Sequence, residues 1–288
     1  MNNKLYLLLL LPLFSCTLEG VKENDNDITD TSIVKAEIDT IDIEDENALK
    51  PDSLNGQANE MVFQRKDGLR IEWDIKNDDQ IQPNDVVMVN YTARVAAGEV
   101  YDSNKELGEP VPLKPGIGMM IPGWEDGLLQ MHIGDKGRIM IPNALAYGED
   151  GYLTIVPPDA DIIVDIEIVS RIKPLKLEDG VKVYKWKTAV DGAKPKKNQV
   201  ITFDYFAYKK GKEAGIYDNS YQHAEPFSFK YKNDNVVDGL HIGMSVMKPG
   251  ENAFIEIPSK VAYGSKGMVD LVPPNTDIVY DVRVSSIQ

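Results

Sequence analysis

The chain has 288 residues and a formal net charge of −15 at pH 7, from 31 Lys and Arg against 46 Asp and Glu. The length suits two domains, and an acidic chain without a basic patch argues against a nucleic-acid-binding protein. The three His share no ligand spacing, and no Ser or Cys nucleophile motif and no glycine-rich phosphate loop is present. We therefore expect neither a metal site nor a cofactor.

The first residues have the pattern of a targeting segment that is not part of the fold. Lys4 precedes the apolar run 5–13, which is too short to span a bilayer, and Ser15 is followed by Cys16, the single Cys of the chain. This pattern resembles a bacterial lipoprotein signal, which implies removal of residues 1–15 and a lipid on Cys16. The protein is then expected in the bacterial cell envelope, anchored to the outer membrane, with the leaflet left open. A plain secretory signal with a chance Cys is the alternative.

An acidic tether is predicted at residues 16–60. Residues 17–60 contain 13 Asp and Glu against 3 Lys, and such a composition keeps a segment extended and solvated. The tether would lift the following domains away from an anionic membrane surface. A short strand around Ile38, Ile41 and Ile43 is the alternative reading of part of this segment.

The rest of the chain repeats itself. Ala146-Tyr147-Gly148 recurs as Ala262-Tyr263-Gly264, and Val156-Pro157-Pro158 recurs as Val272-Pro273-Pro274, both at an offset of 116 residues. A repeat of roughly 105 to 110 residues is a whole domain and not a solenoid unit. We therefore predict one domain at 61–172 and a second at 180–288, joined by the short connection 172–179.

Each repeat is predicted to be mostly β-strand with one short helix. Runs rich in β-branched and aromatic residues predict strands at 86–95, 138–141, 162–169, 199–208, 253–257 and 278–284. Helical spacing of apolar residues predicts helices at 124–131 and 240–247, with Asp238 as the N-cap of the second. Many short strands with one helix indicate an α+β fold, in which a curved antiparallel sheet wraps around the helix.

Five motifs of the first repeat, in this order, resemble the FKBP-type immunophilin prolyl isomerases. They are Val89-Asn90-Tyr91-Thr92, Tyr101-Asp102-Ser103, Met120-Ile121-Pro122-Gly123-Trp124-Glu125-Asp126-Gly127, Ala146-Tyr147-Gly148 and Val156-Pro157-Pro158. The resemblance extends to the second repeat and covers about three quarters of the chain. It implies two FKBP-like units, each a half-wrapped antiparallel sheet around a short helix, and peptidyl-prolyl cis-trans isomerase activity.

The resemblance also implies a pocket in the first unit. Trp124 resembles the indole floor, Tyr147 the tyrosine whose hydroxyl binds the ligand backbone, and Asp102 the buried acid that Tyr91 supports. The implied catalytic residues are Tyr91, Tyr101, Asp102, Trp124 and Tyr147, and the implied substrate-binding residues are Val111, Met120, Ile121, Ile155, Val156 and Val164.

A second pocket is implied at the matching positions of the second unit. Its residues are Tyr205, Tyr217, Asp218, Phe227, Val236, Val237, Leu240, Tyr263, Leu271, Val272 and Tyr280. Neither pocket is complete. The first has Val111 and Val164 where the family has aromatic walls, and the second has Leu240 in place of the Trp floor. We rank the first unit as the likelier isomerase.

The expected function is rotation of Xaa-Pro bonds in an apolar pocket, which assists the folding of exported or envelope proteins. The expected partners are proline-containing unfolded or extended polypeptides, and the membrane through a lipidated Cys16. The alternative is a non-catalytic peptide-binding or scaffold lipoprotein with degenerate pockets, which could belong to a surface motility or secretion machine.

Overall fold

The computed structural model describes residues 61–223 and 225–288, which belong to one compact unit. The predicted signal 1–15, the predicted lipidation site Cys16 and the predicted tether 16–60 lie outside the described residues. Within the described ranges, no helix is long and apolar enough to cross a membrane.

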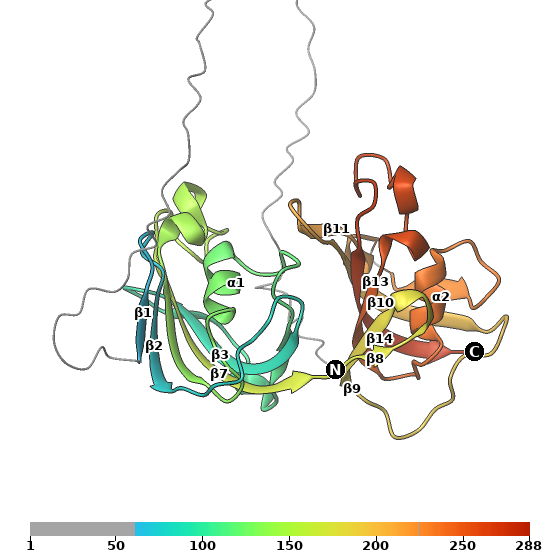
Figure 1. Cartoon of the computed structure of the whole chain (residues 1–288), viewed down its shortest axis with the longest axis horizontal. Coiled ribbons are helices and arrows are strands. Elements are labelled where there is room, and N and C mark those ends of the chain that lie inside the picture. Colours follow the sequence, from blue (N-terminus) through green and yellow to red (C-terminus); the bar gives the residue numbers. More distant parts are fainter. Residues whose placement is uncertain (1–60, 224) are drawn as a thin grey trace, which may run out of the picture. The chain divides into compact units, whose positions relative to one another are not determined.

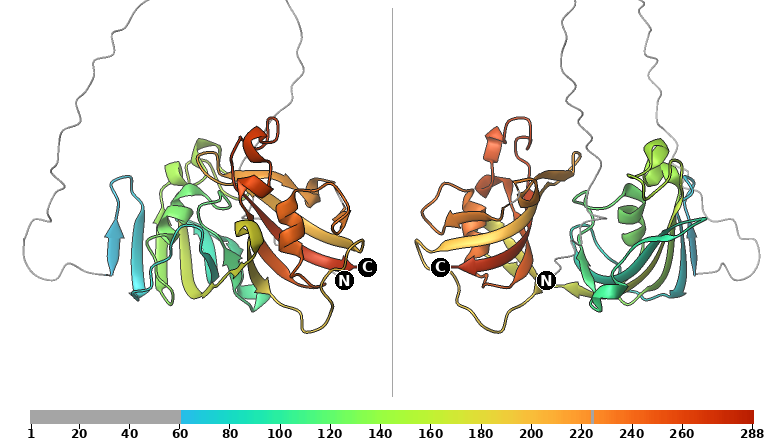
Figure 2. Two further views of the ribbon diagram at one scale, coloured as in Figure 1. Left: turned by 45° about the vertical axis from the view of Figure 1, so that its right-hand side comes forward. Right: turned by 180° about the vertical axis from the view of Figure 1, so that it is seen from behind.

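The first half of the described chain forms one seven-stranded antiparallel sheet. The strand order is β1-β2-β6-β7-β3-β4, and β5 pairs with β3. The sheet curves around helix α1 (Figures 1 and 2). Its elements are β1 (Val62–Gln64), β2 (Arg70–Ile75), β3 (Val86–Val95), β4 (Val100–Ser103), β5 (Val111–Leu113), α1 (Pro122–Leu128), β6 (Lys136–Ile141) and β7 (Ile162–Ile172).

The second half repeats this arrangement in a second seven-stranded antiparallel sheet. The strand order is β11-β10-β14-β13-β9-β8, and β12 pairs with β10. Its elements are β8 (Leu175–Lys176), β9 (Lys182–Lys187), β10 (Val200–Lys209), β11 (Gly215–Asn219), β12 (Phe227–Lys230), α2 (Asp238–Met244), β13 (Asn252–Ile257) and β14 (Ile278–Ile287).

Single turns of 3-10 helix connect these elements. They are η1 (Lys105–Leu107), η2 (Asn143–Leu145), η3 (Gly148–Asp150), η4 (Glu178–Gly180), η5 (Ser220–His223), η6 (Ser259–Val261) and η7 (Gly264–Lys266). Two of them, η3 and η7, follow the repeated tyrosines Tyr147 and Tyr263 directly, so the repeated loops begin with the same local structure.

The α+β class is therefore confirmed, with two units that each curve an antiparallel sheet around one short helix. The strand predicted at 86–95 is β3, and the other predicted strands differ from β6, β7, β10, β13 and β14 by at most three residues at an end. The predicted connection 172–179 contains β8, which pairs with β9.

Both helices begin earlier than predicted. Pro122 is the first residue of α1, where its fixed φ and missing N–H are compatible with a helix start. The prediction of Asp238 as an N-cap is wrong. Val237 holds the N-cap position with extended backbone, and Asp238 is the first helical residue, where its charge still lies in the first turn.

Each helix packs against its sheet at a glycine. A Cβ on Gly127 of α1 would lie 2.7 Å from Cγ2 of Ile139, and a Cβ on Gly243 of α2 would lie 2.3 Å from Cγ2 of Ile255. These approaches are too close for any larger residue without a shift of the helix. They hold each helix close to its sheet, and Trp124 and Leu240 lie one turn before these glycines.

Candidate functional site

The predicted residues of the first pocket come from six different segments and gather in one hydrophobic cluster. Alternation along β3 turns Val87, Val89 and Tyr91 to the same face of the sheet. The strand β4 supplies Tyr101 and Asp102. The remaining residues lie on β5, on or just before α1, in the loop around η3 and on β7: Val111, Met120, Ile121, Trp124, Tyr147, Ile155, Val156 and Val164.

Trp124 is the floor of this group. Its side chain is 1% exposed, and the centroid of its ring lies 5.1 Å from that of Tyr91 in an edge-to-face arrangement. The Nε1–H of Trp124 has no hydrogen-bond partner among the described residues. A buried donor without a partner costs about 1–3 kcal/mol, and a bound ligand with an acceptor atom would satisfy it.

Tyr91 and Asp102 form the polar edge of the pocket. The Tyr91 hydroxyl donates to Oδ2 of Asp102 at 2.7 Å. Burial raises the pKa of Asp102 above its ordinary value, while the bond from Tyr91 and the backbone N–H of Ser103 oppose that shift. Burial is also the main cause of the raised pKa of Tyr91. The tyrosine therefore stays a neutral hydrogen-bond donor at physiological pH.

Three further tyrosines belong to the first pocket or lie next to it. The rings of Tyr101 and Tyr147 meet edge to face at 6.3 Å, and Tyr147 stacks on Tyr152 at 5.2 Å. Burial raises the pKa of Tyr147 to about 12, so its hydroxyl can donate to a ligand carbonyl across the physiological range. Burial and the neighbouring Tyr147 hydroxyl raise the pKa of Tyr101, so this tyrosine also stays neutral. Sequence reasoning missed Tyr152, whose only signal is an aromatic residue inside the loop that follows Tyr147.

Substituting Tyr91 by Phe should raise the pKa of Asp102 further, because the substitution removes a bond that stabilises the carboxylate while the burial remains. The loss of this bond should also cost about 1–3 kcal/mol of unfolding free energy. A carbon-detected NMR titration of the Asp102 carboxyl group measures the first effect and urea unfolding the second. Tyr152→Phe is the matched control, since no hydrogen bond joins it to Asp102. An unchanged or lowered pKa in Tyr91→Phe would contradict the assignment of Tyr91 as the support of this acid.

The second pocket keeps the same polar edge. The Tyr205 hydroxyl donates to Oδ2 of Asp218 at 2.5 Å, and the Tyr217 hydroxyl lies 3.4 Å from that of Tyr280. The rings of Tyr205 and Tyr280 are 5.4 Å apart. Sequence reasoning missed His223, whose Nε2 lies 3.5 Å from Oδ1 of Asp218.

The floor and the rim of the second pocket differ from the first. Leu240 on α2 is buried where the first unit has Trp124, and Val236, Val237, Tyr263 and Val272 pack with it. Phe227 and Leu271 are 39% and 40% exposed, so they lie at the rim and not in the interior. The second site therefore has an aliphatic floor beside its tyrosines.

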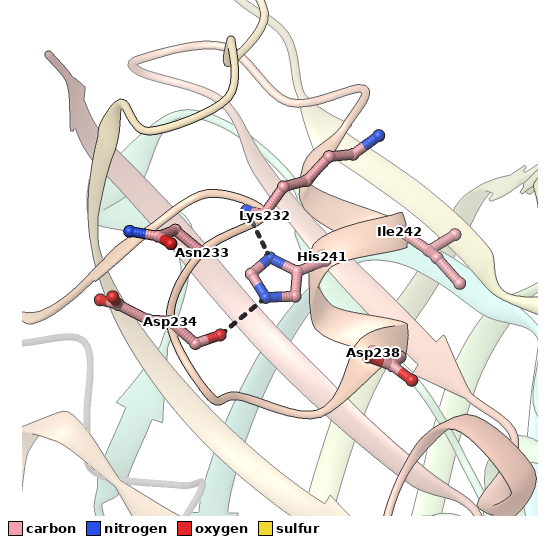
Figure 3. Close-up of a pocket in the computed structure, with 6 residues that line it drawn as sticks. All are labelled: Lys232, Asn233, Asp234, Asp238, His241 and Ile242. Atoms are coloured by element: carbon pink, nitrogen blue, oxygen red, sulfur yellow. Dashed lines mark hydrogen bonds between the residues drawn. The ribbon is translucent and has the colours of Figure 1, made fainter.

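A separate surface pocket lies beside α2 in the second half (Figure 3). It is lined by Lys232, Asn233, Asp234, Asp238, His241 and Ile242 and includes none of the predicted site residues. Nδ1 of His241 accepts from the backbone N–H of Lys232 at 3.1 Å, and Nε2 lies 3.1 Å from the carbonyl oxygen of Asp234. Both ring nitrogens are thus engaged in bracing the loop between β12 and α2.

No group of three or more His, Cys, Asp or Glu residues within the described ranges is arranged to hold a metal ion. The first pocket instead contains a buried indole, one carboxyl group that accepts a hydrogen bond from a tyrosine, and further hydroxyl donors. Such a site can bind an apolar ring and orient a peptide group, and it holds no nucleophile with an adjacent base.

The comparisons with known proteins agree with this geometry. The family model described as "FKBP-type peptidyl-prolyl cis-trans isomerase" matches residues 77–169 and 191–285. FK506-binding protein 2 of Yarrowia lipolytica is 43% identical over 86 residues, which are 30% of this chain and 60% of that protein. Peptidyl-prolyl cis-trans isomerase FPR2 of Saccharomyces cerevisiae is 41% identical over 88 residues, which are 30% of this chain and 65% of that protein.

Longer matches and solved structures extend over both halves. Peptidyl-prolyl cis-trans isomerase FKBP9 of Homo sapiens is 27% identical over 223 residues, which are 76% of this chain and 38% of that protein. The chain thus spans less than two thirds of the length of these curated relatives. The match to the crystal structure of the three FKBP domains of wheat FKBP73 covers 77% of this chain and 96% of that chain at 24% identity, with a TM-score of 0.39.

Proposed function

The chain belongs to the FKBP-type peptidyl-prolyl cis-trans isomerase family, and from this premise we propose that it rotates Xaa-Pro bonds of exported or envelope proteins and so assists their folding. The first pocket is the principal catalyst in this proposal. One observation carries it: the buried ring of Trp124 packs edge to face against Tyr91, which donates to Asp102, and the indole N–H of Trp124 has no partner among the described residues.

The chemistry follows from the electronic structure of the amide. Resonance gives the peptide bond a rotational barrier of about 18–20 kcal/mol and places partial charges on its oxygen and nitrogen. The twisted transition state loses this charge separation, so a water-poor pocket favours it over the planar ground state. A thousandfold acceleration requires only about 4 kcal/mol, which needs no acid, base or metal ion.

Each residue of the first pocket has a separate role in this proposed reaction. Trp124 receives the prolyl ring, and the walls Val111, Met120 and Val156 exclude water from it. The hydroxyl of Tyr147 fixes the substrate backbone. The Tyr91–Asp102 pair presents a polar edge to the rotating carbonyl group. A site of this kind takes a proline-containing segment of an unfolded or extended polypeptide.

A protease-coupled isomerisation assay on residues 61–288 tests the proposal. We expect faster cis-to-trans conversion of short Xaa-Pro peptides in proportion to protein concentration. If no Xaa-Pro peptide is accelerated under conditions in which a reference isomerase works, the enzymatic proposal fails. Binding of the same peptides without turnover would then favour the non-catalytic lipoprotein.

A binding role for the second pocket is favoured by one observation. Leu240 replaces the indole floor, while the Tyr205–Asp218 bond is retained. This pocket would bind one proline-containing segment of a substrate while the first pocket acts on another segment. Such binding raises the effective concentration of the substrate polypeptide at the first pocket.

Membrane attachment through Cys16 is part of the proposal. The motive is the apolar run 5–13, which is followed by Phe14, Ser15 and Cys16. Each buried methylene of an acyl chain contributes about 0.8 kcal/mol of membrane affinity. Cys16→Ser should move the protein from the membrane to the soluble fraction of cells that express the full chain. Unchanged membrane association would contradict lipidation at this residue.

A further inference from the structure

The connection between β5 and α1, residues 114–121, contributes to the first pocket on one side and contacts the second half of the chain on the other. Its last two residues, Met120 and Ile121, are pocket residues. Its first residue, Lys114, is 0% exposed, although it carries a charged side chain. A fully buried lysine is rare unless its ammonium group is paired.

The partners of the Lys114 ammonium come from both halves. Nζ donates to the backbone carbonyl oxygen of Asn84 at 2.5 Å in the first half. In the second half, Nζ lies 3.2 Å from Oε2 of Glu256 and 4.5 Å from the centroid of the Tyr184 ring. The ammonium group is thus held by one carboxylate and one aromatic face of the second sheet.

Glu256 is the centre of this charge cluster. Its Oε1 lies 3.2 Å from Nζ of both Lys182 and Lys210. Burial alone would raise the pKa of Glu256, but the three lysines together lower it to about 2. Burial lowers the pKa of Lys114 to about 8 against the opposing effect of Glu256. Both groups are therefore ionised at neutral pH, and each leaves a buried charge if the other is removed.

The second sheet is buried on both faces around this cluster. Along its strands, the residues that pack in its own core alternate with residues that pack into the hydrophobic core of the first half. The first set includes Val183, Tyr205, Ala207, Ile255 and Tyr280, and the second includes Tyr184, Phe206, Tyr208, Phe254 and Val279. The 114–121 connection also meets the turn between β10 and β11, because a Cβ on Gly118 would lie 2.7 Å from the carbonyl oxygen of Ala214.

The same connection, residues 114–121, is also hydrogen-bonded to a side chain of α1. The carboxylate of Glu125 accepts the backbone N–H groups of Gly116 and Met119, each at 3.1 Å. The backbone N–H of Lys114 donates to Sδ of Met119 at 3.1 Å. The position of Met120 and Ile121 is therefore set jointly by α1 and by the contacts of Lys114 with the second sheet.

We propose that Lys114 and Glu256 are positioning residues for the first pocket. Through them, the second half of the chain holds the substrate-binding connection 114–121 in place, whether or not the second pocket is itself active. Neither residue touches the substrate. The part of this proposal that concerns substrate affinity rests on the proposed isomerase function, whereas the part that concerns the conformation of the connection does not.

The test compares Glu256→Gln with a matched control, Glu251→Gln, in residues 61–288. Glu251 is also buried, at 3% exposed, and pairs with Lys185 inside the second half.

The first readout is the methyl NMR resonances of Met119 and Met120, and the second is KM against kcat for an Xaa-Pro peptide. Glu256→Gln should shift both methionine resonances and raise KM about fivefold or more, the range of ordinary coupling energies, with kcat changed less than twofold. Glu251→Gln should leave both readouts unchanged.

Lys114→Met is a second variant that keeps the test decisive if Glu256→Gln does not fold, because Glu256 then retains Lys182 and Lys210. It should shift the same two resonances. Unshifted resonances in both variants, or an equal response to Glu251→Gln, would overturn the proposal. If the wild type turns over no peptide, the proposed function fails, and the methionine resonances alone then decide whether the second half positions the connection.

Discussion

Replacing Trp124 by Leu should lower kcat/KM of the isomerase about 10- to 100-fold, which corresponds to about 1.4–2.7 kcal/mol of transition-state stabilisation. The substitution removes the aromatic floor on which the prolyl ring would lie and the indole N–H that has no partner among the described residues. The fold should tolerate Leu, since the second half carries Leu240 at the matching position of α2 with 2% exposure.

Trp73→Phe is the control for this experiment. Trp73 is buried at 7% exposure and donates its Nε1–H to Oδ2 of Asp135, outside the pocket. Its replacement should lower the thermal midpoint with little effect on kcat/KM per folded molecule. If Trp124→Leu leaves the activity intact, or if Trp73→Phe lowers it equally, the first pocket is not the catalyst.

Glu256→Gln should lower the free energy of unfolding by about 3–5 kcal/mol at pH 7, the usual result of leaving one buried charge without its partner. The Lys114 ammonium would remain fully buried against Tyr184 with a neutral amide in place of the carboxylate. Urea unfolding of residues 61–288 measures this change. The double variant Lys114→Met with Glu256→Met removes both charges and should be more stable than Glu256→Gln. Equal stability of wild type and Glu256→Gln would show that the ion pair contributes nothing.

The pH dependence of this effect has a definite sign. The pKa of Glu256 is lowered from 4.5 to about 2 in the folded protein. Its contribution to stability is therefore complete above the unfolded value of 4.5 and is lost as the pH falls toward 2. This window amounts to about 3 kcal/mol at most, at 1.36 kcal/mol per pKa unit. The wild type should lose stability more steeply than Glu256→Gln between pH 4.5 and 2, and parallel curves would contradict the assignment.

Much of the fold could be predicted because its signals are local or repeated. Strand β3 was predicted with its observed bounds since β-branched and aromatic residues make up most of Val86–Val95. The starts of α1 and α2 were missed because they depend on Pro122 and on extended backbone at Val237, which helical spacing does not reveal. Short strands such as β1 and β8 exist only through pairing with β2 and β9, so their own residues carry little signal.

The candidate site could be predicted where neighbouring strands bring its residues together. Tyr91 and Asp102 meet because β3 pairs with β4, with Ala93 opposite Asp102. The contact of Tyr91 with Asp102 is implied by the family resemblance, which rests on the order of motifs and not on any single residue. The stacking of Tyr152 on Tyr147 depends on the path of the loop around η3, which the sequence does not encode in a regular pattern.

The short connection 172–179 indicates that the two halves are close neighbours, but the residues that join them were not predicted. Tyr205-Phe206-Ala207-Tyr208 is apolar at every position, which is typical of a strand buried on both faces. The same run also fits an ordinary aromatic-rich strand, so it does not reveal what covers the second face. Lys114 and Glu256 are far apart in the chain, and single charged residues carry no signal of a partner.

The most direct test of the isomerase assignment is exchange NMR on a short Xaa-Pro peptide, in which the cis and trans forms give separate signals. Uncatalysed exchange takes tens to hundreds of seconds. Residues 61–288 at a small fraction of the peptide concentration should bring the exchange into the range of seconds or faster, and Trp124→Leu should remove most of that acceleration. Exchange that stays at the uncatalysed rate with the wild-type protein would contradict the account.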